Sequence, residues 1–283
     1  MTCYLNGEFL PLEEARIPVL DRGFIFGDGV YEVVPVYGRR PYRIAGHLAR
    51  LGRSLAAVRI ANPCTPEHWE ALITELVARQ PHDDQSVYLQ VTRGVARRDH
   101  AFPKDAVPTV FMMSNPLVQP ARELVEQGVR AVTATDNRWY RCDIKSTSLL
   151  PNVLLRQFAV DHGAAEVVLL RNGFLTEGSA SNLFIVRDGV VATPAVSHLI
   201  LAGITYDAVV ELSRAGGLTV EQRDVPEAEV RAADEIWLTS STRELLAITT
   251  LDGRPVGDGR PGPMFRRVYD LLQADTRPPV TRA

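Results

Sequence analysis

Lysine is nearly absent from this chain of 283 residues. Of its 31 basic residues only Lys104 and Lys145 are lysines, and the others are arginines. An amine can lose its proton and become a nucleophile, whereas a guanidinium stays charged, so either lysine is a candidate for chemistry that arginine cannot perform. Composition alone still favours the simpler interpretation of an arginine-rich protein with two incidental lysines.

Cysteine is also scarce, and long apolar runs are missing. Cys3, Cys64 and Cys142 are odd in number and widely spaced, which fits neither a disulfide framework nor a metal site; we expect reduced thiols, no bound metal and a cytoplasmic protein. No segment approaches the roughly 20 apolar residues of a membrane span, and the N-terminus has no signal-peptide pattern. The net charge of −3 gives no positive field that would attract nucleic acid or anionic lipid.

What is present is the composition of a folded globular protein, since 46% of the residues are hydrophobic and 23% charged. The apolar pattern predicts an α+β fold in two domains. The stretch 116–120, bracketed by prolines, is the predicted linker between a smaller domain, 1–115, and a larger one, 121–283. Strands are predicted at 30–37, 86–92, 108–113, 128–136, 167–170, 174–176, 182–186 and 235–239, and helices at 43–60, 66–78, 151–162, 205–215 and 263–273.

Two local signals refine this prediction. Asn6-Gly7 between short apolar runs is typical of a β-hairpin turn. Pro35 lies inside the predicted strand 30–37 and cannot donate a hydrogen bond to a neighbouring strand, which favours an edge or irregular position there.

Lys145 and Glu177 are the first candidates for a functional site. In an extended chain Lys145 and Asp143 would point the same way, although a lone lysine beside hydroxyl residues is more often a solvated amine. Glu177 follows a predicted strand and precedes the turn residues 178–181. A carboxylate in that place is either an ordinary solvent-facing turn residue or a partner for a heterocyclic nitrogen, whose protonated form it would stabilise.

Two further segments have the character of phosphate-binding sites. Leu201-Ala-Gly-Ile-Thr205 runs directly into a predicted helix, so the amides of Ile204 and Thr205 would lie at a helix N-terminus, which attracts anions. Residues 239–242 place four consecutive hydroxyl side chains after a strand, although such a cluster can also serve only as a helix cap. Each segment alone is more often structural, but an aldehyde cofactor with a pyridine ring and a phosphate needs partners of all these kinds.

Together these segments carry a resemblance to a known family. The chain resembles the fold-type IV pyridoxal-phosphate (PLP) enzymes, and within them the bacterial D-amino acid transaminases, from Tyr4 to about Gln273. The matching stretches are 21–34 (DRGFIFGDGVYEVV), 46–51 (GHLARL), 141–146 (RCDIKS), 176–182 (TEGSASN), 201–205 (LAGIT) and 239–242 (TSST). The resemblance implies a small α/β N-terminal domain and a larger C-terminal pseudo-barrel domain that holds PLP.

The resemblance also implies a role for individual residues. Lys145 would form the Schiff base with the cofactor and later carry the proton, and Glu177 would face the pyridine nitrogen. Leu201 would pack against the ring. The phosphate would be held by Arg50, Ile204, Thr205, Ser240 and Ser241. Where the family has a serine after Ser179, this chain has Ala180.

A separate stretch would bind the substrate. In D-amino acid transaminases a tyrosine, an arginine and a histidine bind the α-carboxylate, and the matching positions are Tyr31, Arg98 and His100. In an extended segment Arg98 and His100 would point the same way and could bind a carboxylate through charged hydrogen bonds. Asp99 between them would weaken binding if its carboxylate faced the substrate. The family's loop comes from the neighbouring subunit, which implies a homodimer with a shared active site.

The implied reaction is a ping-pong transfer of an amino group from a D-amino acid to a 2-oxo acid, such as 2-oxoglutarate or pyruvate. A branched-chain L-amino acid aminotransferase is the nearest alternative, and Tyr31, Arg98 and His100 favour D-specificity over it. The same residues disfavour an aminodeoxychorismate lyase and an R-selective amine transaminase. A PLP-binding protein without turnover is the alternative from a different class.

Overall fold

The chain divides into two compact units in a computed structural model that describes residues 1–277. The first unit contains Met1–Val118 and Ile144–Leu149, and the second contains Gln119–Asp143 together with the described residues from Leu150 onward. The boundary at residue 118 lies inside the predicted linker 116–120. The segment Ile144–Leu149 departs from the predicted division, because its backbone hydrogen-bonds to the first unit although the segment lies within 121–283.

The first unit is a six-stranded antiparallel sheet with the order β2-β1-β6-β5-β3-β4. Its strands are β1 (Thr2–Leu5), β2 (Glu8–Pro11), β3 (Gly29–Tyr37), β4 (Arg40–Pro41), β5 (Gln85–Thr92) and β6 (Thr109–Pro116). Its helices are a short 3-10 turn (Leu12–Glu14), α1 (Arg22–Phe26), α2 (Ile44–Ala57) and α3 (Pro66–Ala78). The predicted hairpin at Asn6-Gly7 joins β1 to β2.

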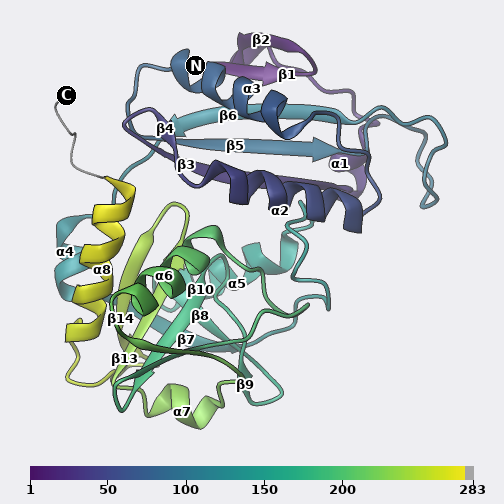
Figure 1. The fold of residues 1–283 in the computed structure, drawn as a ribbon. Coiled ribbons are helices and arrows are strands. Elements are labelled where there is room, and N and C mark those ends of the chain that lie inside the picture. The colour runs from purple at the N-terminus through teal and green to yellow at the C-terminus, as the bar shows by residue number, and fades with distance from the viewer. Residues whose placement is uncertain (278–283) are drawn as a thin grey trace, which may run out of the picture. The chain divides into compact units, whose positions relative to one another are not determined.

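Helices α2 and α3 lie along the same face of this sheet (Figure 1). Since successive strand residues point to opposite faces, every second residue of β3 is turned toward the helices. Val30, Val34 and Val36 are buried there in one core with the apolar residues of α2 and α3. Glu32 lies in the same alternation and is only 1% exposed. A carboxylate at a core position requires charged or hydrogen-bonding partners.

Pro35 is accommodated by the way β3 is paired. β3 pairs with β5 along its whole length, and on its other side the two-residue β4 pairs only with Val36 and Tyr37. The C=O of Pro35 accepts a hydrogen bond from Tyr42, so the position of its missing N–H faces this sparsely paired side. β3 is therefore not an edge strand throughout, since one of its sides is fully paired with β5. Pro35 faces the other side, which is mostly unpaired.

The second unit is built on a mixed sheet of nine strands. Eight of them have the order β12-β11-β10-β13-β14-β7-β8-β9, and the ninth, β15, pairs with β14. Its strands are β7 (Val129–Thr135), β8 (Glu166–Arg171), β9 (Phe174–Leu175), β10 (Asn182–Arg187), β11 (Val190–Thr193), β12 (Thr219–Gln222), β13 (Glu235–Ser240), β14 (Glu244–Leu251) and β15 (Arg254–Pro255). Its helices are α4 (Arg122–Gln127), α5 (Leu150–Asp161), α6 (Ile204–Ala215), α7 (Glu227–Arg231) and α8 (Pro263–Thr276).

This sheet curls so that its two ends meet. Val225 and Pro226 follow the end strand β12, and they contact the opposite end strand: Leu175 in β9 donates a hydrogen bond to Val225 (2.8 Å), and Phe174 pairs with Pro226. The result is the predicted pseudo-barrel. Its interior is filled by alternate residues of the central strands, including Leu183, Ile185, Ile236, Leu238 and Ile248.

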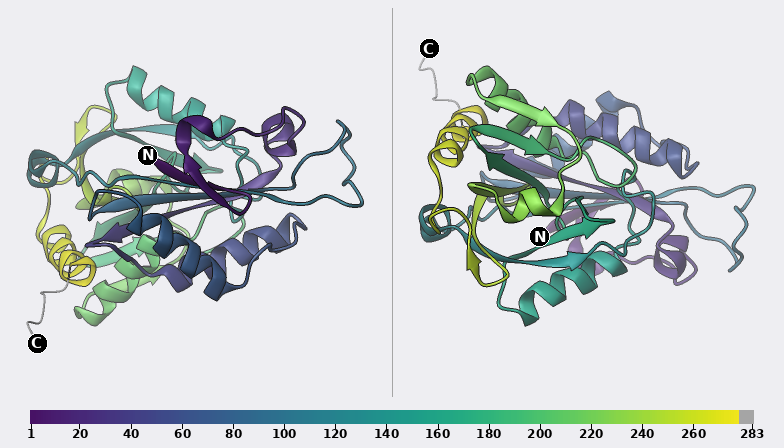
Figure 2. Two further views of the ribbon diagram at one scale, coloured as in Figure 1. Left: turned by 90° about the horizontal axis from the view of Figure 1, so that it is seen from above. Right: turned by 90° about the horizontal axis from the view of Figure 1, so that it is seen from below.

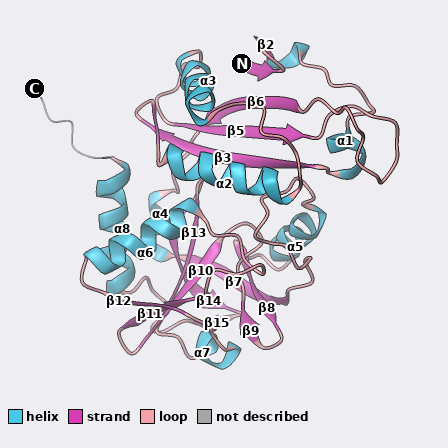
Figure 3. Cartoon of the chain, turned by 45° about the vertical axis from the view of Figure 1, so that its right-hand side comes forward, coloured by secondary structure: helices cyan, strands magenta, loops and turns pink. Residues whose placement is uncertain are grey.

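The residues between those interior positions are buried too. Phe184 and Trp237 lie side by side on the outer face. Phe184 stacks with Tyr206 of α6, and Trp237 makes an edge-to-face contact with Phe265 of α8. Helices α6 and α8 run next to each other over this face (Figure 3). Because both faces of β10 and β13 are covered, these strands are rigid supports for the loops at their ends. None of the described helices combines the length and apolar character needed to span a bilayer.

Candidate functional site

Glu177 lies at the start of the turn that connects β9 to β10. The turn is fixed by Glu166 of β8, whose carboxylate accepts hydrogen bonds from the backbone N–H of Ser179 (3.0 Å) and from the hydroxyls of Ser179 and Ser181 (2.9 Å for Ser181). A side chain at Gly178 would approach Ser181 Oγ to 2.3 Å, so the turn requires glycine. These contacts set the direction in which Glu177 projects.

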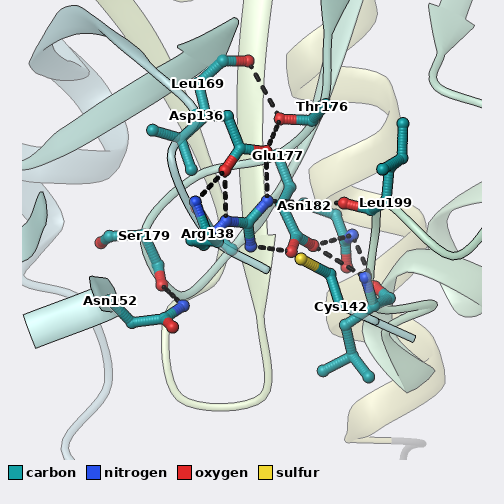
Figure 4. Close-up of polar contacts among 12 residues, drawn as sticks. Asp136, Arg138, Cys142, Asn152, Leu169, Thr176, Glu177, Ser179, Asn182 and Leu199 are labelled. Carbon is teal, nitrogen blue, oxygen red and sulfur yellow. Dashed lines mark hydrogen bonds and ion pairs between the residues drawn. The ribbon is translucent and has the colours of Figure 1, made fainter. Parts of the chain in front are cut away.

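The carboxylate of Glu177 is buried and surrounded by donors (Figure 4). Its Oε1 accepts a hydrogen bond from Arg138, and its Oε2 accepts from the backbone N–H of Leu201 (3.0 Å) and from Asn182 Nδ2 (3.4 Å). Burial raises the pKa of Glu177, and the Arg138 guanidinium offsets part of that rise. The negative charge of Glu177 therefore depends on Arg138 for its stabilisation.

Arg138 is itself held by a second carboxylate. Asp136, at the end of β7, binds Arg138 Nε and Nη2 (both 2.9 Å) and also contacts Arg171 (3.0 Å) and Thr176 (2.9 Å). Burial opposes the ionisation of Asp136, but the hydrogen bonds and charge of Arg138 lower its pKa to about 2. The cluster thus contains two carboxylates and two guanidiniums, which compensate one another inside the protein.

The start of helix α6 lies beside this carboxylate. Asn182 Nδ2 donates to the C=O of Leu201 (2.8 Å), and a Cβ at Gly203 would be 2.4 Å from Asn182 Oδ1. Gly203 precedes the helix and has no side chain to cap it, so the first-turn amides, including those of Ile204 and Thr205, have the character of an anion-binding helix N-terminus. Ile204 and Thr205 are both buried.

The hydroxyl segment 239–242 is brought to the same place by strand pairing. Asn182 is paired with Thr239 across β10 and β13, and the next two residues are Ser240, the last residue of β13, and Ser241. Ser240 Oγ accepts a hydrogen bond from the backbone N–H of Arg243 (3.2 Å) and therefore closes the turn. Within the second unit Asn182 thus contacts the predicted residues Glu177 and Leu201. Its other neighbours, Gly203 and Thr239, are each followed directly in the chain by two more predicted residues, namely Ile204 and Thr205, and Ser240 and Ser241.

Lys145 belongs to the first unit, where it lies against β3. Its C=O accepts a hydrogen bond from Tyr31 N–H (2.9 Å), and its N–H donates to Ser54 Oγ of α2 (3.3 Å). Its Nζ is 4.2 Å from the centre of the Tyr31 ring, which in turn stacks on Tyr88 at 5.7 Å. Backbone pairing on one side and an aromatic face on the other therefore fix the position of the amine.

Arg50 is the predicted phosphate ligand in this unit, and it is paired with Glu32. Arg50 Nε and Nη2 donate to Glu32 at 2.8 and 2.7 Å, and His47 Nδ1 lies 2.8 Å from Glu32 Oε2. Burial opposes the ionisation of Glu32, but Arg50 and His47 lower its pKa to about 2. Burial also lowers the pKa of His47. Nδ1–H therefore donates to the carboxylate, and His47 Nε2 is buried and has no hydrogen-bond partner among residues 1–277.

Arg98 and His100 lie on the loop between β5 and β6, where both are exposed. Each rests on the ring of Phe26 in α1, at 5.4 Å from its centre. The structure thus brings these two predicted substrate residues together. In the described part of this single chain, neither makes a hydrogen bond or ring contact with Tyr31, the third member of the set.

Two departures from the family pattern have a clear structural setting. The Asp99 carboxylate accepts a hydrogen bond from the backbone N–H of Ala101 (3.1 Å), so it shapes the loop and is not directed between Arg98 and His100. Ala180 is an exposed residue of the turn after Glu177. The Ser179 and Ser181 hydroxyls on either side of it both bind Glu166, so the turn is held without a hydroxyl at Ala180.

Comparison with known proteins decides the family. The sequence profile of the Amino-transferase class IV family matches residues 29–251, well over half of the chain. The chain belongs to the class IV aminotransferases. This aminotransferase is 39% identical to the D-alanine aminotransferase of Bacillus licheniformis over 273 residues, which cover 96% of each chain. It is 36% identical to the D-alanine aminotransferase of Staphylococcus aureus over 268 residues, covering 94% of this chain and 95% of the relative.

Solved structures agree with this assignment. The branched-chain amino acid aminotransferase of Escherichia coli superposes with a TM-score of 0.89 and 26% identity, covering 96% of this chain and 92% of that one. The branched-chain aminotransferase of the archaeon Thermoproteus uzoniensis, solved with norvaline, gives a TM-score of 0.87 and 25% identity, with coverage of 97% and 94%. The fold of the aminotransferase is therefore fold type IV, as the sequence predicts.

Class IV aminotransferases depend on PLP, and the donor groups of this aminotransferase fit that cofactor. A buried carboxylate beside the Arg138 guanidinium suits a protonated ring nitrogen, and the uncapped first turn of α6 suits a phosphate. The hydroxyls that follow β13 add donors for the same phosphate. The first unit offers the amine of Lys145, and an amine is the group that can bind the aldehyde of PLP covalently.

Several residues of these clusters are missing from the sequence-based site. Arg138 and Asn182 bind Glu177, and Asp136 binds Arg138. Glu32 binds Arg50, and His47 binds Glu32. The sequence contained a signal for Glu32, because this carboxylate interrupts the valines at the core positions of β3 and must therefore have a charged or hydrogen-bonding partner. For Asp136 and Arg138 the sequence offered no comparable signal, since their partner Glu177 is about 40 residues away along the chain.

The Glu32–Arg50 pair predicts an acid-sensitive step in stability. Because folding lowers the pKa of Glu32 from 4.5 to about 2, the pair contributes stability above pH 4.5 that is lost as the pH falls toward 2. Glu32→Gln leaves a buried guanidinium without its anion, so we expect it to lower the free energy of unfolding by about 3–5 kcal/mol at pH 7. Denaturant unfolding between pH 7 and pH 3 measures this.

The variant should also respond less to acid than the wild type, so the two stabilities converge as the pH falls. Glu70→Gln, at an exposed position of α3 in the same unit, is the matched control and should follow the wild-type curve. A constant difference between Glu32→Gln and wild type from pH 7 to pH 3 would show that the Glu32 charge does not stabilise the fold.

Proposed function

We propose that this aminotransferase transfers the amino group of a D-amino acid to a 2-oxo acid, such as 2-oxoglutarate or pyruvate, by a ping-pong reaction. The observation that carries the proposal is the full-length similarity to D-alanine aminotransferases, at up to 39% identity over 96% of the chain. The branched-chain enzymes of known structure described above share the fold at 25–26% identity. That likeness makes a branched-chain L-amino acid aminotransferase the second candidate.

The proposal assigns Lys145 as the catalytic residue. Pyridoxal phosphate, when bound, supplies an electron sink that makes the α-proton of an amino acid acidic. Lys145 holds the cofactor through its amine and, once released by the substrate, removes the α-proton and returns it. The Tyr31 ring at 4.2 Å restricts the amine to a narrow range of positions, which favours proton transfer along a defined path.

Glu177 has an electrostatic role in the same proposal. It keeps the ring nitrogen protonated, and this requires a carboxylate that is itself ionised. Burial acts against that ionisation, and Arg138 counteracts burial. In this proposal Arg50, Ile204, Thr205, Ser240 and Ser241 would hold the phosphate, and Leu201 would pack against the ring.

The substrate α-carboxylate is bound by Tyr31, Arg98 and His100. Because Arg98 and His100 lie on an exposed loop, we assign them to the active site of a neighbouring subunit in a homodimer. An exposed apolar face on α5 supports association with a second copy; it is formed by Leu150, Val153, Leu154 and Phe158. The three cysteines form no disulfide with one another, in keeping with a cytoplasmic enzyme.

Stereochemistry tests the proposal most simply. With 2-oxoglutarate as acceptor, D-alanine should give a kcat/KM at least tenfold above that of L-leucine in a coupled assay. Equal or reversed values would favour the branched-chain aminotransferase and contradict the D-specific assignment. Cofactor binding without release of any 2-oxo acid from either amino acid would favour a binding protein without turnover.

Arg98→Ala should weaken substrate binding. Loss of one charged hydrogen-bonding partner of a carboxylate removes about 1.5–3 kcal/mol, so KM for D-alanine should rise on the order of 10- to 100-fold with a smaller change in kcat. Arg97→Ala is the matched control, since it removes the neighbouring guanidinium from the same loop. If both variants raise KM equally, Arg98 has no specific role and the loop acts only through its overall charge.

A further inference from the structure

The loop between β5 and β6 carries Arg98 and His100 and extends well beyond the ends of these strands (Figure 2). At its base the two arms approach closely: Gly94 has a φ of +92°, and a Cβ there would lie 1.9 Å from the C=O of Val107. From residue 96 to the tip the loop has no strand pairing of its own. The placement of Arg98 and His100 must therefore come from side-chain contacts.

Such contacts converge on the carboxylate of Asp28, whose side chain is 13% exposed. Asp28 accepts hydrogen bonds from Arg22 Nε (2.7 Å) and from Arg93 Nε and Nη2 (2.8 and 3.0 Å). Arg93 also donates to the C=O groups of Val58 (2.7 Å) and Arg59 (3.0 Å), just after helix α2. Arg22, Asp28 and Arg93 are called the loop anchor below, and it is tied to the rigid core of the first unit.

The other side of the loop anchor reaches the loop itself. Arg22 Nη1 donates to the C=O of Asp99 (2.5 Å), the residue between Arg98 and His100. The Arg93 guanidinium lies 3.7 Å from the centre of the Phe102 ring, two residues beyond His100. The loop is thus held on both sides of the pair that is proposed to bind the carboxylate.

Phe26 completes the arrangement. Its ring is contacted by Arg22 (4.8 Å), Arg98 (5.4 Å) and His100 (5.4 Å), so it serves as a common support for the anchor and for both substrate residues. A planar guanidinium can hold Asp28 and Asp99 in fixed directions at the same time, which a lysine ammonium cannot do. The Asp28 carboxylate also prevents repulsion between the two buried guanidiniums.

We propose that the loop anchor, acting with Phe26, sets the positions of Arg98 and His100 and thereby determines the affinity for the substrate carboxylate. Arg22 and Phe26 are positioning residues, because they act on the substrate carboxylate only by placing Arg98 and His100. This inference rests on the D-amino acid transaminase function proposed above and assigns to the chain a specificity determinant outside its cofactor-binding residues.

Arg22→Lys tests the anchor with its charge retained. We expect KM for D-alanine to rise about tenfold or more, with kcat at saturation changing less than threefold, because a displaced loop weakens binding without altering the proton transfer. Phe26→Leu removes the support without changing any charge and should give the same pattern. Arg53→Lys, on the exposed face of α2, is the control and should match the wild type.

A double variant separates positioning from a general structural effect. If Arg22 acts through Arg98 and His100, then Arg22→Lys should raise KM by a smaller factor in the Arg98→Ala background than in the wild type, because only His100 is left to be displaced. Multiplied effects would overturn the proposal, because they would show that Arg22 acts by another route.

Hydrogen exchange of the loop supplies a readout that does not depend on turnover. Backbone amides of residues 95–103 should exchange faster in Arg22→Lys than in wild type, with the rest of the first unit unchanged. Unchanged exchange would refute the anchor even if no D-amino acid proved to be a substrate. Faster exchange with an unchanged KM in an active enzyme would refute the link to carboxylate affinity.

Discussion

Lys145→Ala is expected to lower transamination of D-alanine by on the order of 10⁴-fold or more while the protein still folds. The residue supplies both the amine that holds the cofactor and the base that moves the α-proton, and no other lysine of this chain lies in the clusters described above. The side chain is only partly buried and its backbone makes the hydrogen bonds that hold the segment, so alanine preserves the pairing with β3. Steady-state rates and circular dichroism measure the two effects.

The chain provides a natural control for this experiment. Lys104 is the only other lysine, and it lies in the loop between β5 and β6. Lys104→Ala removes the same functional group and should retain activity within about threefold. If Lys145→Ala kept substantial activity while Lys104→Ala lost it, the catalytic assignment would be wrong.

Glu177→Gln is expected to have the next largest effect, with kcat lowered on the order of 10²- to 10³-fold. Glutamine keeps the shape of the side chain and can still accept a hydrogen bond from Leu201, but it has no charge to stabilise a protonated ring nitrogen. It also leaves Arg138 with a single carboxylate partner, Asp136. The loss should appear in kcat more than in KM, because the charge acts on the reacting bonds and not on substrate binding.

Glu235→Gln is the matched control for this charge. Glu235 is another buried carboxylate of the second unit, where it binds Trp237 and the first amides of α8. Its replacement affects stability but should leave kcat close to that of wild type in the folded fraction. Equal losses of kcat in both variants would mean that Glu177 contributes only through the fold.

The sequence predicted the framework well because that framework is recorded in local periodicity. Helices α2, α3, α6 and α8 show apolar residues at helical spacing, and the structure places each of them within a few residues of its predicted range. β14 was not predicted, although it is a central strand that pairs with β13 and β7. Its pairing with β7 joins residues more than 100 positions apart, and a local pattern does not reveal such pairing. The short helices α1, α4 and α7 owe their formation to tertiary contacts, which periodicity does not reveal.

The candidate site was predicted in part, for a related reason. Residues that would contact the cofactor occur in compact motifs and could be named from the sequence, and they remain predictions. The residues that compensate the charges of these motif residues are scattered along the chain. A buried ion needs a partner that is close in the folded structure, and that partner need not be close in the sequence. Arg138 reaches Glu177 and Arg22 reaches Asp99 only after folding. The sequence also contained no sign that the strand-like segment with Lys145 would join the first unit.

The central claim is that Lys145 carries the cofactor of a D-amino acid transaminase. Borohydride reduction of the PLP-loaded enzyme, followed by digestion and mass spectrometry, tests it most directly. We expect a phosphopyridoxyl group on the peptide that contains Lys145, and we expect prior addition of D-alanine, but not of L-leucine, to reduce the yield of this adduct. An adduct on Lys104, or no adduct on either lysine, would contradict the account.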